Sequence, residues 1–367
     1  MTEPPNHAGG NPADPARSPA PAPGGAGEST AFSLALAWRK RPAVRAAFYL
    51  LALALLAAAV WFALAETSGQ EGGPGGFARL AHADPLDAAV IALLIVASIA
   101  LNGVVFWLIA KPFEHARTEP APSVTLPEMT ALIGASSLLN YLPMRAGMVG
   151  RAAYLKRRHH IPLTASVVML LMVGGGTVYI YLVMSIVTLW RGSLDPAWWA
   201  TVVALLAAGS LAAVPVARIK VRLTPMLDAP WFASAGAPLW LGAAALVFLR
   251  AADVLLAAGR LYLAARILGQ PIDLAPAIVM ASGGMFIKQA TPLPNGFGVV
   301  ELFYALCASL GIAADSPIEP QLATAVGLVD RAVEVIVFVV VGLGSLLFLR
   351  DKWHGDDPEL TDPTRAV

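Results

Sequence analysis

The stretches LNYLPMRAGMVGR, residues 139–151, and ATPLPNGFGVVEL, residues 290–302, decide the fold of this chain. Each contains a Leu-Pro step, a short polar kink, a glycine and then a charged residue, and each lies inside or beside an apolar region. Prolines and charges are costly there, because proline breaks the hydrogen bonds of a helix and a buried charge loses its hydration. The same costly order occurring twice predicts one structural feature used twice.

The composition identifies the class of protein. The 367 residues are 57% apolar and 13% charged, and the mean hydropathy is +0.67. A soluble domain of this size needs more charge, so we expect a polytopic membrane protein. The net charge of +1 gives no overall field that attracts nucleic acid. The single cysteine, Cys307, excludes an internal disulfide and a multi-cysteine metal site, and no metal or cofactor is expected.

Six segments are apolar enough to cross a bilayer as helices, which takes about 20 residues. Basic clusters beside them place both termini in the cytoplasm by the positive-inside rule. We expect a disordered Pro/Ala/Gly-rich tail over residues 1–37, an integral membrane domain over 38–350 and a short cytoplasmic tail over 351–367. The six predicted spans are Ala46–Ala65, Ala88–Ala110, Thr164–Trp190, Trp198–Ala217, Pro238–Ala265 and Leu322–Leu349.

Two further apolar regions, Met129–Gly150 and Ala277–Ile312, do not fit as through-spans. Counting each as a span would put the basic run KRRHH, residues 156–160, outside the cell. As re-entrant helical hairpins, the first enters from the cytoplasm and the second from outside, and all basic clusters stay cytoplasmic. Irregular backbone at membrane depth is tolerated only inside protein or beside a watery cavity, so we expect the Leu-Pro kinks at the hairpin tips.

The order of elements repeats. A shift of 151 residues carries the first half, residues 46–190, onto the second half, residues 198–349. Each half has an odd number of crossings, so the halves are expected to be inverted, as in many secondary transporters. The sequence thus predicts an all-α polytopic membrane protein with six transmembrane helices and two opposed re-entrant hairpins in an inverted repeat. Coinciding positions are Pro143 with Pro294, Gly147 with Gly298 and Asn102 with Asp253.

Charged residues at the tips are candidates for substrate binding, because intramembrane charges mark function by default. Arg145 and Arg151 flank the first tip and suit a phosphate or carboxylate headgroup. The structural alternative is that both reach to the cytoplasmic surface. Glu301 follows the second tip as a counter-ion, a proton acceptor, an ion-pair partner or simply a favourable charge at a helix N-terminus. Lys288 is a candidate partner for it.

Other candidates lie on the fifth and sixth spans and at the glycines. Arg250 with Asp253, and Arg331 with Glu334, are each at (i, i+3), which favours either a local ion pair or part of a substrate path. Asp330 precedes the second pair. The glycines near the tips, Gly147, Gly296 and Gly298, suit tight hairpin geometry or a close approach of the backbone.

Three motifs resemble the flippase-like transmembrane domain of lysylphosphatidylglycerol synthases, a family that also includes stand-alone membrane proteins. They are NYLPMRAGMVGRAAYLKRR, TPLPNGFGVVE and GLVDRAVEVIVFVVVG, and the resemblance runs from about Ala46 to Leu349. Met148 stands where the family usually has glutamate. The resemblance implies a lipid-handling protein of the bacterial cytoplasmic membrane. Matching positions are Asn140, Pro143, Arg145, Gly147, Arg151, Pro294, Gly296, Gly298, Glu301 and Arg331.

The leading hypothesis is a lipid flippase whose hairpins form a polar groove for a headgroup while the acyl tails stay in lipid. Arg145 and Arg151 would contact its phosphate, and Glu301 and Arg331 would pair across the groove. The alternatives are an accessory subunit, or an integral membrane enzyme, for modification of lipids or lipid-linked glycans. The expected partner is a lipid with an anionic headgroup, and a separate lipid-modifying enzyme or a second copy of the chain is the candidate protein partner.

Overall fold

The computed structural model describes residues 84–115, 121–142, 145–223, 236–270, 272–291, 293–312 and 318–354, all within one compact unit, Ala46–Val367. These residues form helices and connecting turns without any strand, which confirms the all-α prediction for this part of the chain. The predicted first span, Ala46–Ala65, and the predicted tail over residues 1–37 lie outside the described residues.

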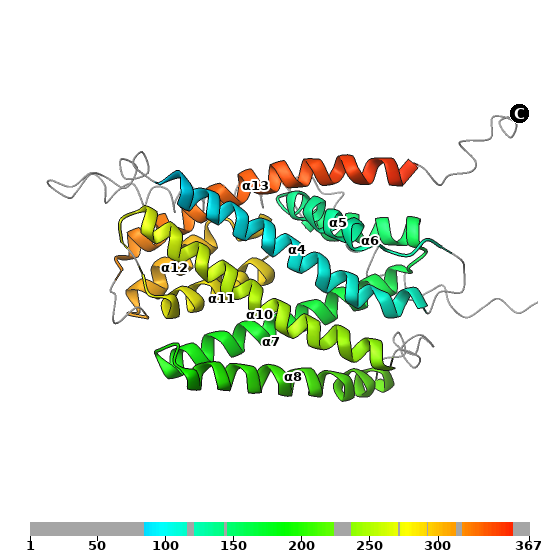
Figure 1. Ribbon diagram of the computed structural model, residues 1–367, viewed down its shortest axis with the longest axis horizontal. Coiled ribbons are helices and arrows are strands. Elements are labelled where there is room, and N and C mark those ends of the chain that lie inside the picture. The colour runs from blue at the N-terminus through cyan, green and yellow to red at the C-terminus, as the bar shows by residue number, and fades with distance from the viewer. Residues whose placement is uncertain are drawn as a thin grey trace, which may run out of the picture. The chain divides into compact units, whose positions relative to one another are not determined.

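Four helices of the described part are long and apolar enough to cross a membrane, namely α4, α7, α10 and α13. They match four of the predicted spans. The predicted span Trp198–Ala217 falls in α8, whose described apolar part, Pro196–Ala212, is shorter. In chain order (Figure 1), the helices are α4 (Pro85–His115), α5 (Leu126–Leu139), α6 (Ala146–His159), α7 (Leu163–Arg191), α8 (Pro196–Leu223), α10 (Gly236–Ile267), α11 (Leu274–Ala290), the short 3-10 helix η3 (Pro294–Gly296), α12 (Val299–Ser309) and α13 (Pro320–His354).

The long helices α4 and α10 pack against each other at the centre of this unit (Figure 1). The core buries Ile95 of α4 together with Val254, Ala258 and Leu261 of α10. On either side of this pair the packing follows one pattern. Helix α4 contacts α5 and α13, which contact each other, and α10 contacts α11 and α7, which also contact each other.

Each of the two predicted tip regions contains a helix, a break and a second helix. Helix α5 ends at Leu139 and α6 begins at Ala146, while α11 ends at Ala290 and α12 begins at Val299 after η3. The two arms pack against each other in both cases, so each forms a helical hairpin. The second arm of the first hairpin is longer than predicted, because α6 continues past Gly150 to His159 and includes most of the basic run.

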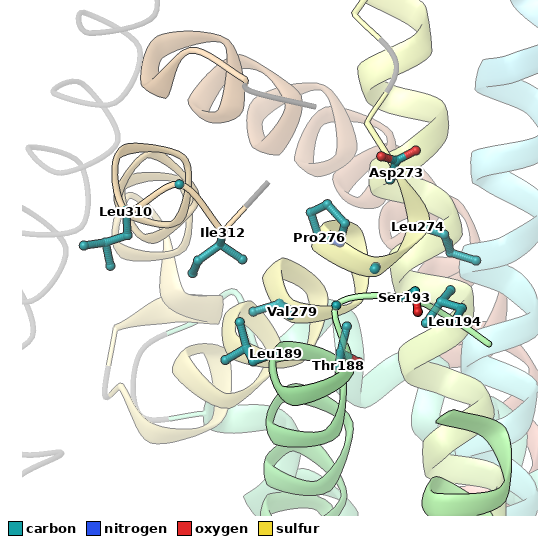
Figure 2. A pocket seen from close by; sticks show the side chains of 13 residues that line it. Thr188, Leu189, Ser193, Leu194, Asp273, Leu274, Pro276, Val279, Leu310 and Ile312 are labelled. Carbon is teal, nitrogen blue, oxygen red and sulfur yellow. The ribbon is translucent and has the colours of Figure 1, made fainter. Parts of the chain in front are cut away.

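The open end of the second hairpin lies beside the end of α7. The start of α11, the end of α12 and the turn after α7 surround a pocket of about 630 Å³ (Figure 2). Helix α7 ends because Gly192 adopts a left-handed conformation, with φ of +69°, that glycine tolerates at a helix C-terminus. Asp273 is the one carboxylate in the lining of this pocket.

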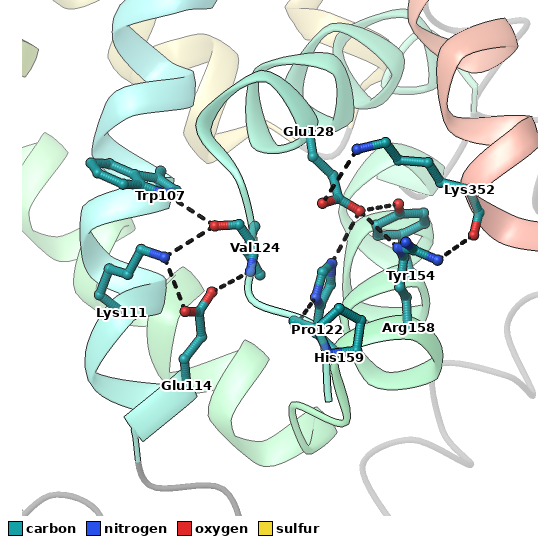
Figure 3. A network of polar contacts seen from close by, with 10 residues as sticks. All are labelled: Trp107, Lys111, Glu114, Pro122, Val124, Glu128, Tyr154, Arg158, His159 and Lys352. Carbon is teal, nitrogen blue, oxygen red and sulfur yellow. Dashed lines mark hydrogen bonds and ion pairs between the residues drawn. The ribbon is translucent and has the colours of Figure 1, made fainter. Parts of the chain in front are cut away.

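The open end of the first hairpin is held by a polar network on Glu128, at the start of α5 (Figure 3). Its Oε1 accepts hydrogen bonds from the Tyr154 hydroxyl at 2.5 Å and from Nε of Arg158 at 3.1 Å, and lies 3.2 Å from Nε2 of His159. Arg158 also donates to the carbonyl oxygen of Lys352, near the end of α13, at 2.5 Å. The network therefore joins both arms of the first hairpin to α13.

Gly147 lets α6 start close against the end of α5. A Cβ atom at this position would overlap the carbonyl oxygen of Ser136. We expect Gly147→Ala to lower the free energy of unfolding by about 1–3 kcal/mol, as overpacking does elsewhere. Thermal unfolding in one detergent, followed by tryptophan fluorescence, measures the change. Gly150→Ala is the matched control, because its Cβ would make an ordinary contact with Leu139 at 3.7 Å. Equal destabilisation by both variants would contradict the close approach.

The Glu128 network predicts a pH dependence of stability. Burial raises the pKa of the Glu128 carboxyl, but hydrogen bonds from His159 and Tyr154 outweigh burial and lower the pKa from 4.5 to about 2. A lowered carboxyl pKa contributes stability that is present above pH 4.5 and lost as the pH falls toward 2. Glu128→Gln should therefore cost about 2 kcal/mol at pH 7, and the difference from the wild type should shrink below pH 4.5.

Unfolding measured between pH 7 and pH 3 in a non-ionic detergent tests this dependence. Glu319→Gln replaces an exposed carboxylate beside the start of α13 and serves as the control, with an expected change within about 0.5 kcal/mol. A cost of Glu128→Gln that stays constant with pH would show that the charge of Glu128 is not what stabilises the network.

Candidate functional site

A pocket of about 220 Å³ lies between the breaks of the two hairpins. The first hairpin, α7 and the second hairpin all contribute to its wall. Two cationic side chains, Arg145 and Lys288, face it together with amide side chains, and its lining contains no carboxylate. The lining residues are Asn140, Arg145, Met148, Tyr181, Met285, Lys288, Gln289 and Asn295.

Arg145 connects the two hairpins. Its Nη2 atom donates to the carbonyl oxygens of Lys288 at 3.0 Å and Thr291 at 2.9 Å, and it also contacts that of Gln289. These carbonyls lie at the C-terminal end of α11, where a helix has carbonyls without partners and a partial negative charge. Among the described residues no acceptor contacts Nε or Nη1 of Arg145. The guanidinium therefore caps α11 with one nitrogen, and its other donors have no acceptor among the described residues.

The backbone at both breaks is left-handed at residues other than glycine. Arg145 has a φ of +50° and Asn295 a φ of +46°. Such conformations cost about 1–2 kcal/mol and tend to occur at functional sites. In the second break Gly296 and Gly298 also have positive φ, at +70° and +78°, and Pro294 is buried at the start of η3. The glycines thus allow the chain to turn between α11 and α12.

Several polar atoms around the breaks are buried without a partner among the described residues. They include Oδ1 of Asn140, Nδ2 of Asn295 and Oε2 of Glu301. Buried polar atoms are nearly always hydrogen-bonded in folded proteins. Asn140 and Asn295 also line the pocket between the breaks, so this is the place where polar groups of a ligand or water would complete the hydrogen bonding.

A chain of buried ion pairs lies beside the pocket. Nε of Arg331 lies 3.2 Å from Oε1 of Glu301, and its Nη1 lies 2.8 Å from Oε2 of Glu334. Nζ of Lys288 lies 3.0 Å from the same Glu334 carboxylate. The predicted (i, i+3) pair of Arg331 and Glu334 is confirmed. Lys288 pairs with Glu334 on α13 rather than with Glu301, the candidate partner on its own hairpin.

Two further buried ion pairs involve α10. Arg260 and Asp330 of α13 are 3.1 Å apart and both are buried, a contact that the sequence did not reveal. The predicted pair of Arg250 and Asp253 is confirmed at 3.1 Å. Asp253 also accepts hydrogen bonds from Asn102 at 3.2 Å and from Ser98, both on α4.

The predicted site residues are thus divided among several places. Arg145 and Asn140 line the pocket between the breaks, and Glu301 and Arg331 form the buried pair beside it. Arg151 lines a different pocket, between α5, α6 and α13. Pro143 lies outside the described residues. The sequence analysis missed the pocket residues Gln289 and Asn295, whose only signal was their position beside the Leu-Pro kink.

The buried pair of Arg331 and Glu301 gives a test of stability. Arg331→Gln should cost about 3–5 kcal/mol, because it leaves a buried carboxylate without its cation. Adding Glu301→Gln removes that charge, so the double variant should be more stable than Arg331→Gln alone. Unfolding of the three proteins in detergent measures both effects. The control is Arg191→Gln, which breaks a half-buried pair with Asp195 and should cost at most about 1 kcal/mol. A double variant that is no more stable than Arg331→Gln alone would contradict this coupling.

The comparison with known proteins gives one match. The family model of the lysylphosphatidylglycerol synthase TM region matches residues 49–342, while no curated protein and no solved structure matches the chain. The matched segment contains both hairpins, the pocket between their breaks and the ion pairs of α10 and α13. It spans well over half of the sequence and confirms the resemblance seen in the three motifs. The chain belongs to the family of the lysylphosphatidylglycerol synthase transmembrane region.

Proposed function

We propose that this chain is a flippase-like protein that moves an anionic phospholipid or lipid-linked headgroup between the leaflets of a bacterial cytoplasmic membrane. It would do so as six membrane spans with two opposed re-entrant hairpins in an inverted repeat. The family match supports a membrane protein concerned with lipids. The pocket between the hairpin breaks supplies the place where a headgroup would bind.

The pattern of packing supports the inverted repeat. The shift of 151 residues that relates the two predicted halves makes α4 correspond to α10, α5 to α11, and α7 to α13. The contacts of α4 with α5 and α13 then correspond to those of α10 with α11 and α7. Asn102 and Asp253 coincide under the same shift and contact each other directly. Equivalent residues meet in this way where they lie on a twofold axis.

The positions of the open ends of the two hairpins support the proposal that the hairpins enter the membrane from opposite sides. The open end of the second hairpin surrounds a pocket with the end of α7, where that helix would reach the outer surface (Figure 2). The open end of the first hairpin is tied to the end of α13, which would reach the cytoplasm (Figure 3). The breaks between them meet where Arg145 caps α11. Non-helical backbone at this depth would be enclosed by protein, as the bilayer requires.

The observation that carries the proposal is the uncompensated charge of Arg145. Lys288 is neutralised by Glu334, whereas Arg145 contacts only backbone carbonyls, and the pocket has no carboxylate. A phosphate oxygen bound to Nη1 or to Nε would receive a charge-assisted hydrogen bond of the kind that a guanidinium makes with phosphate. Amide side chains of Asn140, Gln289 and Asn295 would contact the rest of the headgroup. A volume of about 220 Å³ suits a headgroup alone, so the acyl tails would stay in lipid.

Lipid scrambling in proteoliposomes tests this function. Dithionite quenching of fluorescent phosphatidylglycerol measures how much label the protein brings to the outer leaflet. We expect Arg145→Gln to slow scrambling by about 10-fold or more, because a charged hydrogen bond to phosphate is worth roughly 1.5–3 kcal/mol. Arg157→Gln, a change at an exposed arginine of α6, should scramble like the wild type.

The same assay separates the alternatives. Scrambling that is unchanged by Arg145→Gln would reject the pocket as the headgroup site. If no lipid of any headgroup is scrambled, the flippase proposal fails and the accessory-subunit hypothesis is favoured. Formation of a new lipid product by the purified protein alone would instead favour a membrane enzyme.

A further inference from the structure

Arg151 differs from the other buried arginines of the described residues. It is 8% exposed and forms neither a hydrogen bond nor an ion pair with any described residue. Its guanidinium carbon lies 3.9 Å from the centre of the Phe106 ring, in a cation–π contact. By contrast, each of the other three contacts at least one carboxylate; they are Arg250, Arg260 and Arg331.

The charges around Arg151 do not balance. The charged residue that acts on it is Arg250, which has the same sign. The acid beside Arg250 is Asp253, which already accepts hydrogen bonds from Arg250, Ser98 and Asn102. Two cations and one carboxylate leave one positive charge without a counter-ion inside the protein. A buried charge of this kind is destabilising, so the surroundings of Arg151 favour an anion.

The guanidinium of Arg151 lies in a small cavity between α4, α5, α6 and α7. Phe106, against which it packs, lines this cavity and not the larger pocket between α5, α6 and α13, although Arg151 contributes to both. The centre of a water-sized particle has about 10 Å³ available in the cavity. This is room for about one water molecule or one small ion, and a phosphate or carboxylate group is too large.

Ser166 gives the cavity a second polar group. It lies near the start of α7, is 3% exposed and lines the same cavity. Its hydroxyl is buried without a hydrogen-bond partner among the described residues. The other side chains of the lining are apolar, and they include Met129 of α5 and Met169 of α7. The cavity thus combines a cation and a hydroxyl donor with apolar walls, and its lining contains no carboxylate.

We infer that this cavity is a halide site, which holds one chloride ion between the guanidinium of Arg151 and the hydroxyl of Ser166. Both groups donate hydrogen bonds, and a monatomic anion accepts them from any direction. A water molecule would fit the same space but would leave the positive charge unbalanced. The ion would join α6 to α7 beside α4. The site is separate from the pocket between the breaks and does not depend on lipid transport.

Thermal unfolding of the purified full chain in a non-ionic detergent tests this site. Chloride or bromide replaces gluconate at constant ionic strength, and tryptophan fluorescence follows unfolding. An ion that binds only the folded protein raises its unfolding temperature. We expect chloride and bromide to raise the unfolding temperature with a saturable dependence on concentration. Methanesulfonate, a monovalent anion too large for the cavity, should act like gluconate.

Two variants assign the effect to the cavity. Arg151→Met keeps a side chain of similar length against Phe106 but removes the charge. It should weaken chloride binding by about 10-fold or more, since a hydrogen bond to a charged group is worth roughly 1.5–3 kcal/mol. In gluconate it should be at least as stable as the wild type. Ser166→Ala removes one neutral donor and should weaken binding by roughly 2- to 10-fold. Arg157→Gln, at an exposed arginine of α6, is the control and should bind chloride normally.

Bromide also locates the ion independently of any variant. In crystals grown with sodium bromide, the anomalous signal should lie within hydrogen-bond distance of the guanidinium of Arg151. A bromide peak elsewhere, or none at this place, would overturn the inference.

The unfolding measurements can overturn it as well. Equal stabilisation by chloride and methanesulfonate would exclude a site of this size. Chloride dependence that persists in Arg151→Met would place the ion elsewhere. A lower stability of Arg151→Met than of the wild type in gluconate would show that the guanidinium stabilises the fold without an anion.

Discussion

Helix ends that would lie at membrane depth need partners, and the structure depends on how this chain supplies them. A break in a helix exposes backbone carbonyls and amides that hydrocarbon cannot satisfy. Here Arg145, at the break of the first hairpin, caps the carbonyls at the end of α11 in the second hairpin. The end of α11 is therefore completed by a residue of the other hairpin. This contact joins the two hairpins at their breaks.

The sequence predicted the elements of the fold better than the contacts among them. Long apolar stretches bounded by charges gave four of the long helices, and the Leu-Pro kinks gave both breaks, because span length and proline geometry are local constraints. The pairs Arg250–Asp253 and Arg331–Glu334 also followed from helical spacing. By contrast, the pair Arg260–Asp330 joins helices that are distant in sequence, and no local pattern encodes the rotation of one helix against another.

The separation of Arg145 and Arg151 has a simple geometric cause that the sequence analysis overlooked. Arg145 has a left-handed backbone at the break before α6, whereas Arg151 lies inside that helix. The two side chains therefore extend in different directions. One reaches the end of α11, and the other lies over Phe106 on α4. A motif that looks like a single pair of anion-binding arginines in the sequence thus serves two pockets.

The geometry of Arg145 also explains why arginine, rather than lysine, suits this position. The fold uses Nη2, which contacts the carbonyls of α11, and this leaves Nη1 or Nε of the same planar group for a ligand in the pocket. A lysine has a single nitrogen, so capping the helix and holding a phosphate would compete for the same donors. With arginine both can occur together, and a bound headgroup need not release the contact between the hairpins. The residue that joins the two hairpins would therefore also be the one that binds the proposed headgroup.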